Sequence, residues 1–285
     1  MSTTPPKFSF RNKVREAIYI RRTNIKNGFN DKIYSLDKKS VAYPFVEKFG
    51  VSYPKVYFKN TKLSLIDFSE IKGSFVLKPE QAHSSLGVFL CHYDDKLKKY
   101  RDLFTNEIRE LNDIKKMAAD IMVEKKIHDQ WLVEELVYPD DGQLYALDDW
   151  KFYCFYGEVG LILQKRKSLD GNVTYKLYDK DFVQVKNTGK YLGKIDDLLP
   201  LPKFQNEMID IAQTLSGKIP LPFMRVDLFS SSRGVVFGEF TPFPGGFSMF
   251  WNTWNEKLGK MWVEAEARLD RDIKLGHFYN LYSQI

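Results

Sequence analysis

The sequence predicts an α+β protein in which antiparallel sheet dominates. Short apolar runs typical of strands are mixed with amphipathic helical stretches, without the strict alternation of a parallel α/β fold. Two of the runs, residues 223–229 and 235–240, are separated only by the turn 230–234 and therefore form a hairpin. The chain has 285 residues, of which 44% are hydrophobic. That is enough to bury a core without disulfide bonds.

Periodicity gives the order of the elements. Apolar residues recur every three to five positions in helical stretches and form short alternating or continuous runs in strands. The expected helices cover residues 8–30, 36–49, 102–126, 203–215 and 253–273. The expected strands cover residues 74–79, 86–92, 131–137, 150–155, 159–165, 173–178, 223–229 and 235–240. The run 242–246 (PFPGG) is a loop, because two prolines and two glycines suit neither a helix nor a strand.

These elements suggest four parts. Residues 1–35 form a basic helical arm, and residues 36–70 form a helical linker segment. A small α+β subdomain covers residues 71–138. A larger one covers residues 139–285 and ends in the C-terminal helix.

Composition excludes several classes of protein. No apolar run approaches the ~18–20 residues that a membrane-spanning helix needs. The first residues, MSTTPP, lack the apolar segment of a secretory signal. The two cysteines, Cys91 and Cys154, lie in strand-like runs, which fits a reducing compartment. We therefore expect a soluble cytoplasmic protein with no transmembrane segment.

The net charge of +6 is concentrated near the N-terminus. Residues 7–30 contain seven lysines and arginines against one acid, Glu16, and the rest of the chain is neutral. Such a segment can contact an anionic membrane surface or another polyanion. For so short a segment, a solvated helix face is the favoured alternative.

Charged residues interrupt the apolar strands. Burying a charge costs several kcal/mol unless it is paired or meets an ion or ligand, so these positions are candidate functional residues. They are Lys78, Glu134, Glu135, Asp149, Lys151, Arg225, Asp227 and Glu239.

The hairpin suggests a metal site. Arg225 and Asp227 are two residues apart and share one face of their strand, and Glu239 can reach that face from the neighbouring strand. Two carboxylates beside an arginine suit a Mg²⁺–phosphate site. A structural salt bridge among the same residues is the alternative.

Weaker signals surround this hairpin. Ser84, Ser85 and Gly87, next to Lys78, can offer hydroxyls and backbone amides to phosphate, although any hairpin turn uses such residues. Further candidates for substrate contact follow from their positions near a strand end and in the proline–glycine loop. They are Lys165, Arg166, Phe243, Gly245 and Gly246.

The order of these motifs resembles the ATP-grasp superfamily. Residues 75–79 (FVLKP) and 83–87 (HSSLG) resemble the lysine strand and phosphate loop of D-alanine–D-alanine ligases. Residues 133–137 (VEELV) are similar to the hinge that holds adenine. Residues 225–227 (RVD) and 238–241 (GEFT) resemble the strands that bind Mg²⁺.

A narrower resemblance points to one branch. Residues 149–155 (DWKFYCF) and 238–247 (GEFTPFPGGF) resemble the TupA-like branch, which is linked to teichuronopeptide and other surface-polysaccharide synthesis. The resemblance spans about residues 35–260. It implies an ATP-grasp fold, with two α+β subdomains that clasp ATP, and here a truncated helical N-terminus.

The resemblance also implies roles for individual residues. Arg225 and Lys151 are the implied catalytic residues, and Asp227, Glu239 and Thr241 the implied ligands of Mg²⁺, expected as two ions. Thr241 stands where these ligases usually carry Asn. The residues implied to bind ATP are Lys38, Lys78, Ser84, Ser85, Gly87, Glu134, Glu135, Val137, Asp141 and Lys151.

Enzymes of this superfamily activate a carboxylate by phosphoryl transfer from ATP, and an amine then displaces the phosphate. We therefore expect an ATP- and Mg²⁺-dependent ligase that joins an amine to a small-molecule or glycan carboxylate, for example a uronic acid. One alternative is a kinase that stops at phosphoryl transfer. The other is a non-catalytic nucleotide-binding protein with a basic recruiting arm.

Overall fold

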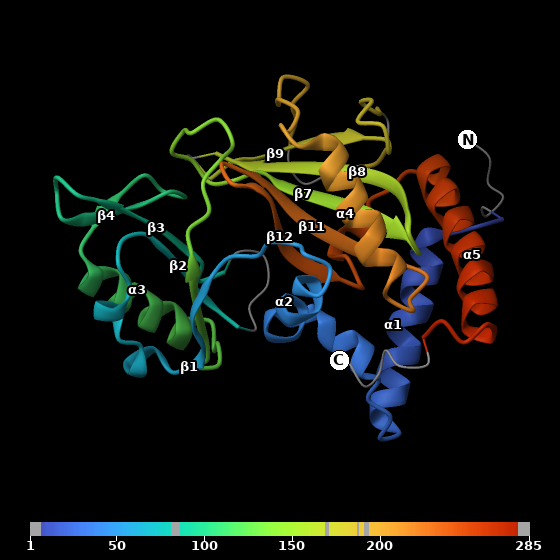
Figure 1. Ribbon diagram of the computed structural model, residues 1–285, viewed down its shortest axis with the longest axis horizontal. Helices are drawn as coiled ribbons and strands as arrows, with labels where there is room; N and C mark the ends of the chain where they lie inside the picture. The colour runs from blue at the N-terminus through green and yellow to red at the C-terminus, as the bar shows by residue number, and fades with distance from the viewer. Residues whose placement is uncertain (1–6, 81–85, 169–170, 187, 191–193, 279–285) are drawn as a thin grey trace.

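The computed structural model describes residues 7–80, 86–168, 171–186, 188–190 and 194–278, and this part of the chain contains two six-stranded sheets (Figure 1). Neighbouring strands are antiparallel except for the pair β9–β10. The expected α+β class is confirmed.

The smaller sheet has the strand order β1–β6–β2–β3–β4–β5. Its strands are β1 (Val56–Thr61), β2 (Phe75–Pro79), β3 (Phe89–Asp94), β4 (Lys99–Asp102), β5 (Ile108–Arg109) and β6 (Trp131–Glu135). Helix α3 (Leu111–Glu124) covers one face, where Ile114 and Ala118 pack against Phe75, Leu77 and Trp131. Side chains alternate along a strand, so Lys78 and Glu134 lie on the other face.

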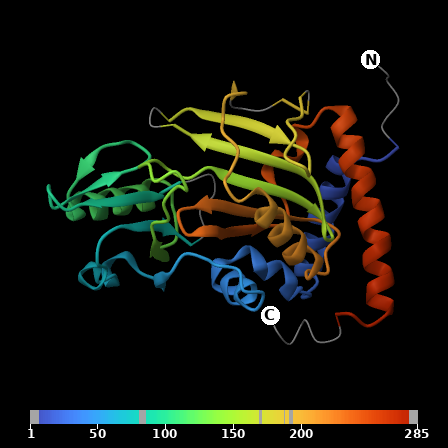
Figure 2. The ribbon, with the colours of Figure 1, turned by 45° about the horizontal axis from the view of Figure 1, so that its top comes forward.

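The larger sheet has the order β10–β9–β8–β7–β11–β12. Its strands are β7 (Asp149–Phe155), β8 (Glu158–Lys167), β9 (Val173–Tyr178), β10 (Lys194–Ile195), β11 (Met224–Ser231) and β12 (Gly234–Thr241). Helices cover both faces, as Figures 1 and 2 show. These helices are α1 (Phe10–Lys26), α2 (Lys39–Glu47), α4 (Gln205–Gly217) and α5 (Asn252–Lys274); short 3₁₀ helices are η1 (Lys32–Asp37), η2 (Leu63–Leu65), η3 (Phe68–Glu70) and η4 (Gly245–Ser248).

Strand alternation gives the larger sheet two separate cores. Phe152 and Val226 point to the face covered by α2 and α4. Tyr153, Phe155 and Phe223 point to the face covered by α1 and α5. The candidate catalytic residues share the second face, just beyond the region that the two helices cover.

The basic N-terminal helix packs on this second core. Phe10 and Val14 of α1 are fully buried there, and the Lys13 ammonium lies 2.8 Å from the Glu266 carboxylate of α5. The helix is therefore an integral layer of the larger subdomain, although its last turns expose Tyr19 and Ile25.

The helix predicted for residues 102–126 is too long at its start. It begins at Leu111, and residues 99–109 form β4 and β5. Asp102 causes the difference, because its carboxylate accepts a hydrogen bond from the Phe104 amide and its carbonyl accepts one from the Asn106 amide. Asn106 has a φ of 60°, which closes the turn.

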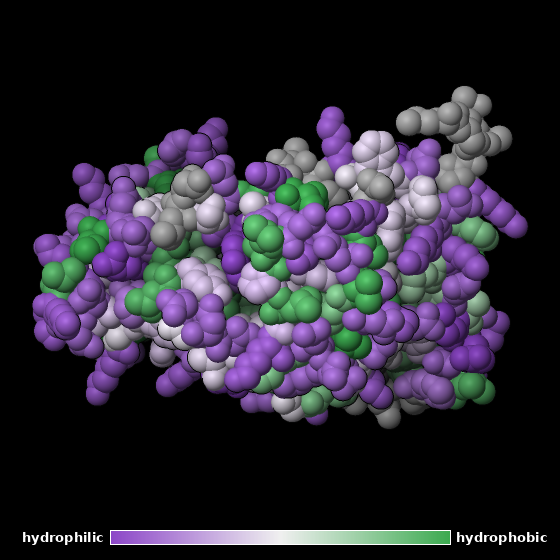
Figure 3. All heavy atoms as spheres, turned by 90° about the horizontal axis from the view of Figure 1, so that it is seen from above, coloured by the Kyte–Doolittle hydropathy of each residue, from purple (hydrophilic) through white to green (hydrophobic). Residues whose placement is uncertain are grey.

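In the part of the chain that the structure describes, no helix is long and apolar enough to cross a membrane. The face seen in Figure 3 is largely hydrophilic, with hydrophobic residues in scattered groups.

The contact between α1 and α5 gives a testable prediction. A Cβ at Gly259 would lie 2.5 Å from the Ser9 nitrogen and 2.7 Å from the Phe10 nitrogen, both backbone atoms. We expect Gly259→Ala to destabilise the protein by about 2 kcal/mol and to lower the Tm by roughly 4–8 °C. Thermal unfolding measures this. Gly245→Ala is the control, because a Cβ there meets no atom within 4 Å; equal losses in both variants would contradict the packing.

Candidate active site

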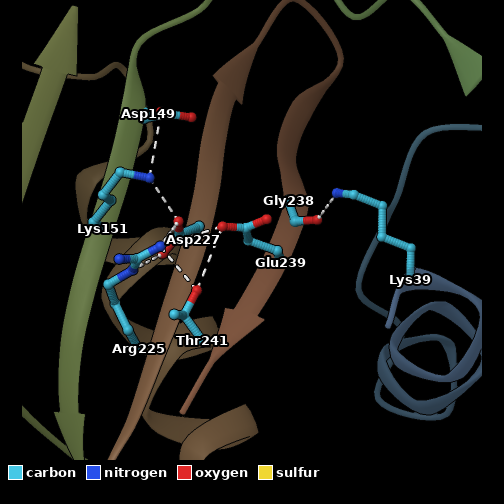
Figure 4. A network of polar contacts seen from close by, with 8 residues as sticks. All are labelled: Lys39, Asp149, Lys151, Arg225, Asp227, Gly238, Glu239 and Thr241. Atoms are coloured by element: carbon cyan, nitrogen blue, oxygen red, sulfur yellow. Dashed lines mark hydrogen bonds and ion pairs between the residues drawn. The ribbon is translucent and has the colours of Figure 1, made fainter. Parts of the chain in front are cut away.

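Three neighbouring strands carry the charged residues of the hairpin site. Across the strands, Lys151 of β7 pairs with Asp227 of β11, and Asp227 pairs with Glu239 of β12. Residues opposite each other on neighbouring strands point to the same face. Figure 4 shows the resulting cluster, with Arg225 and Thr241 as the next pair along. The structure thus brings together the five residues that the sequence placed on these strands.

Asp227 is the centre of the cluster (Figure 4). Its two carboxylate oxygens accept hydrogen bonds from the Arg225 guanidinium at 2.6 and 2.7 Å. The Lys151 ammonium donates to one of them at 2.7 Å and lies 3.3 Å from Asp149. Asp227 is only 2% exposed. The salt bridge between Arg225 and Asp227, which the sequence analysis gave as the alternative to a metal site, is therefore present, and it is linked through Lys151 to Asp149.

These cations decide the charge of Asp227. Burial by itself raises its pKa, but the Arg225 guanidinium and the Lys151 ammonium outweigh that effect and lower the pKa to about 2. Burial lowers the pKa of Lys151 and of Arg225, but neighbouring carboxylates outweigh that effect and raise both pKa values. These carboxylates are Asp149 and Asp227 for Lys151, and Asp227 and Glu239 for Arg225. Asp227, Lys151 and Arg225 are therefore all ionised at neutral pH.

Glu239 and Thr241 form the more accessible side of the cluster. The Glu239 side chain is 45% exposed, and one of its oxygens lies 3.2 Å from Arg225. The Thr241 hydroxyl accepts a hydrogen bond from Arg225 at 2.8 Å and donates to Glu239 at 3.4 Å. Thr241 therefore connects the guanidinium to the glutamate.

A bulge in β12 sets the direction of Glu239. The pairing changes register between Asp227 and Leu228, with Gly238 as the extra residue. A Cβ at Gly238 would lie 3.0 Å from the Asp227 carbonyl oxygen. The Gly238 carbonyl accepts a hydrogen bond from the Lys39 ammonium of α2 at 2.6 Å (Figure 4).

A second polar cluster lies on the facing sheet. Lys78 of β2 forms an ion pair with Glu134 of β6, and the Tyr43 hydroxyl of α2 donates to the other oxygen of Glu134 at 2.8 Å. Lys78 and Glu134 are both mostly buried, with side chains 15% and 6% exposed. The contact of Tyr43 with Glu134 joins a helix of the larger subdomain to the smaller sheet.

The ammonium groups of Lys78 and Lys39 both lower the pKa of Glu134. Burial and the nearby Lys39 ammonium together lower the pKa of Lys78 to about 8, in spite of the attraction of Glu134. Glu134 keeps a low pKa, because the two lysines outweigh its burial. Lys78 is therefore a cation that loses its charge just above neutral pH.

The other residues that were expected to bind ATP lie around the Lys78–Glu134 cluster or beyond it. The Glu135 carboxylate accepts hydrogen bonds from the Lys55 amide and from Arg233, both at 3.0 Å. Val137 is buried after the end of β6. Asp141 is exposed and accepts a hydrogen bond from the Tyr145 hydroxyl at 2.9 Å.

The predicted phosphate loop is described only at its ends. Ser84 and Ser85 lie outside the described residues. Gly87 has a φ of 70°, and a Cβ there would lie 3.0 Å from the ring of Pro79. Glycine therefore allows the chain to return close against the lysine strand.

Sequence reasoning placed the first phosphate lysine at Lys38 and did not single out Lys39 or Tyr43. Lys38 is exposed at the N-cap position of α2, whereas Lys39 reaches the Glu134 cluster. Two adjacent lysines give no signal of which one faces inward until the start of the helix is known. Tyr43 looked like an ordinary helical core residue.

Lys165 and Arg166, although adjacent, lie on opposite faces of β8. Lys165 pairs across the strands with Asp149 and shares the face of the Asp227 cluster. Arg166 makes two hydrogen bonds, of 2.6 and 2.8 Å, with the buried carboxylate of Asp148 on the other face. Only Lys165 has the placement expected of a substrate contact.

The proline–glycine loop continues from the cluster. Phe243 stacks on Tyr34 of η1, with ring centroids 5.4 Å apart, and Gly245 and Gly246 begin η4. This loop therefore lies against the N-terminal helices.

The cluster suits Mg²⁺ only in part. Asp227 and Glu239 are hard oxygen donors on adjacent strands, as Mg²⁺ prefers. Within the described residues, no group of three or more His, Cys, Asp or Glu side chains can hold a metal. Magnesium commonly completes its shell with substrate phosphates and water. The pair therefore fits an ion that arrives with a phosphorylated substrate.

Comparison with known proteins identifies the family and the fold of the chain. The model of the TupA-like ATP-grasp family matches residues 16–263. A structure of D-alanine–D-alanine ligase from Bacillus anthracis aligns with a TM-score of 0.55 at 15% identity, covering 89% of this chain and 76% of the ligase. The same ligase complexed with ATP aligns with a TM-score of 0.53 at 14% identity, covering 89% and 75%. No curated protein matches the sequence.

The ion pairs of Asp227 predict a pH-dependent stability. Because its folded pKa lies below the unfolded value of about 3.9, its contribution is complete above pH ~4 and is lost as the pH falls toward 2. We expect Asp227→Asn to lower the free energy of unfolding by about 2–3 kcal/mol at pH 7. The gap to the unmodified protein should narrow at pH 3.

Urea unfolding at pH 7, 5 and 3 measures this dependence. Asp149→Asn is the matched control, because its carboxylate also contacts Lys151 but is 35% exposed. A gap of the same size at pH 7 and pH 3, or an equal loss in the control, would contradict the assignment.

Proposed function

This chain belongs to the TupA-like ATP-grasp family, and we propose that it is an ATP- and Mg²⁺-dependent carbon–nitrogen ligase that activates a carboxylate as an acyl phosphate. The observation that carries the proposal is the hydrogen-bonded cluster of Lys151, Arg225, Asp227 and Glu239 on three adjoining strands. A structural salt bridge needs only one cation for Asp227. Here two cations and a half-exposed second carboxylate converge.

The cleft between the two sheets is the proposed nucleotide site. Lys78, Lys151 and Lys39, with Lys38 nearby, supply positive charge for the phosphates. The Glu134 carboxylate and the backbone through Val137 suit the adenine, and Asp141 the ribose. A cavity of about 600 Å³, lined by Lys39, Tyr43, Leu132 and Glu80, leaves room for a ligand beside this cluster.

The metal site of this proposal is completed by the nucleotide. Asp227 and Glu239 would hold Mg²⁺, with Thr241 as a weaker third ligand and two ions expected. A bound Mg²⁺ supplies Lewis-acid stabilisation of phosphoryl oxygens. The Glu239 carboxylate is the more accessible of the two, whereas both oxygens of Asp227 already accept hydrogen bonds from Arg225.

The chain's own residues would act by position and charge. Lys151 stays protonated beside Asp149 and Asp227 and can neutralise charge on the transferred phosphoryl group. The Arg225 guanidinium can move its hydrogen bonds from Asp227 to the acyl phosphate and to the tetrahedral intermediate. A protein nucleophile is not required, because the amine attacks the activated carboxylate directly.

The substrates follow from the surroundings of the cluster. Lys165, on the same face, suits the substrate carboxylate, and the loop with Phe243, Gly245 and Gly246 suits the rest of that molecule. We propose a uronic acid, another glycan carboxylate or a small-metabolite carboxylate. Arg166 is hydrogen-bonded to Asp148 and stabilises the sheet from its opposite face.

Turnover of ATP tests the proposal. In the presence of Mg²⁺, pooled amines and uronic acids, we expect the protein to release ADP and free phosphate in equal amounts. Glu239→Gln should lower the rate by about 10²–10³, because it removes a charge from the metal site with little effect on packing. Glu264→Gln, on the outer face of α5, is the matched control and should retain the rate.

The products separate the alternatives. ADP with phosphate retained on a product would indicate a kinase. AMP as the product would contradict the acyl-phosphate route. The absence of turnover, together with no Mg²⁺-dependent thermal shift by ATP, would indicate a non-catalytic protein.

The pKa of Lys78 predicts how ATP affinity depends on pH. The ammonium loses its proton as the pH rises through about 8, so binding a phosphate above that pH requires prior protonation. We expect ATP affinity to fall about tenfold between pH 8 and pH 9.5. Lys78→Arg, which stays charged, should show a flat profile. Titration calorimetry measures both, and a flat profile in the unmodified protein would contradict the role of Lys78.

A further inference from the structure

A second cavity, of about 220 Å³, lies beside the loop that follows β12. Helices α1 and α5 form two of its walls, through Ile20 and Trp262. Tyr34 of η1 and Phe243 of the proline–glycine loop form a third. The basic N-terminal helix thus has a second role besides covering the core, because it closes a cavity at the edge of the candidate active site.

The cavity adjoins the catalytic cluster on the same face of the sheet. Phe223 lines it and precedes Arg225 by two residues, so both side chains point to one face. Two residues of a strand span about 6.6 Å. On the neighbouring strand, Pro242 lines the cavity and directly follows Thr241, which accepts a hydrogen bond from Arg225 at 2.8 Å. The cavity and the guanidinium therefore lie on the same face of the sheet, about two strand residues apart.

The walls of the cavity are mainly apolar and aromatic. Trp262 stacks on Phe223 with ring centroids 5.4 Å apart. Tyr34 and Phe243 stack on each other, and the guanidinium of Arg21 lies 4.7 Å from the Tyr34 ring centroid. Aromatic faces attract cations, and the flat walls pack well against methylene groups.

The charged residues of the lining leave one carboxylate in excess. The Lys13 ammonium donates to both oxygens of Glu266, at 2.9 and 2.8 Å, and the Trp262 ring nitrogen donates to one of them at 2.9 Å. Glu266 is thereby satisfied. Glu16 lines the same cavity, lies 4.0 Å from Lys13 and is 62% exposed. Arg21, which lies over the Tyr34 ring, is paired with Asp37 at 3.6 Å. The charged groups around the cavity are therefore three acids and two bases, so its mouth favours a cation.

We propose that this cavity binds the far end of the amine substrate, an unbranched methylene chain that ends in a second ammonium group, as in a diamine or a basic amino acid. The terminal ammonium pairs with Glu16, the methylenes lie against Trp262 and Ile20, and the reacting amine points to Arg225. A 150 Å³ cavity in another protein holds benzene, so 220 Å³ accommodates a chain of about five methylenes. The identity of the molecule as a substrate rests on the proposed ligase; its binding here does not.

Binding of 1,5-diaminopentane to the full chain tests the assignment. The reporter is the Trp262 ring N–H, followed by NMR in protein labelled on its five tryptophans and assigned with Trp262→Phe. We expect a saturable shift of this resonance with the diamine and none with the neutral isostere 1,5-pentanediol. Glu16→Gln should weaken binding about two- to fivefold. The control Glu264→Gln, also on a helix but outside the cavity, should not.

Three results would overturn the assignment: no saturable shift, equal shifts with the diol, or unchanged affinity in Glu16→Gln. ATP turnover on the same preparation separates the two proposals. Diamine binding without turnover leaves the cation site in place and contradicts the ligase. Turnover that proceeds while Trp262 does not respond contradicts the cation site alone.

Discussion

Asp227, buried between Arg225 and Lys151, is the contact on which the rest of the structure depends. An unpaired charge at that depth would cost several kcal/mol, so the strands that supply the two cations must stay in register with β11. The apolar cores on both faces of the larger sheet hold that register. The helices, including α1, thus serve the site by fixing three strands. The free-energy cost of removing the Asp227 carboxylate from water is offset only while all three charges are present.

The smaller sheet must also stay close to the Asp227 cluster. Two polar contacts join the larger subdomain to the smaller sheet: Tyr43 to Glu134 and Arg233 to Glu135. Lys39 of α2 donates to Gly238 within the larger subdomain. In the proposed nucleotide site, Lys78 of the smaller sheet, with Lys39 and Lys151 of the larger subdomain, would supply positive charge for one anionic ligand.

The sequence predicted the parts of this arrangement that depend on strand alternation. Arg225, Asp227 and Glu239 were placed on one face because two-residue spacing and a tight turn permit little else. The start of α3 was not predictable from periodicity, since Asp102 and Asn106 form a turn through local hydrogen bonds within an apolar pattern. The choice between Lys38 and Lys39, and the packing of α1, depend on long-range contacts such as that of Gly259 with Ser9.

We propose that Asp227 and Glu239 form a metal site that only a bound nucleotide completes. The most direct measurement is a titration with Mn²⁺, as a paramagnetic substitute for Mg²⁺, followed by electron paramagnetic resonance with and without a non-hydrolysable ATP analogue. We expect weak binding of the ion alone and tight binding of one or two ions with the analogue. Tight binding without the nucleotide, or none with it, would contradict this metal site.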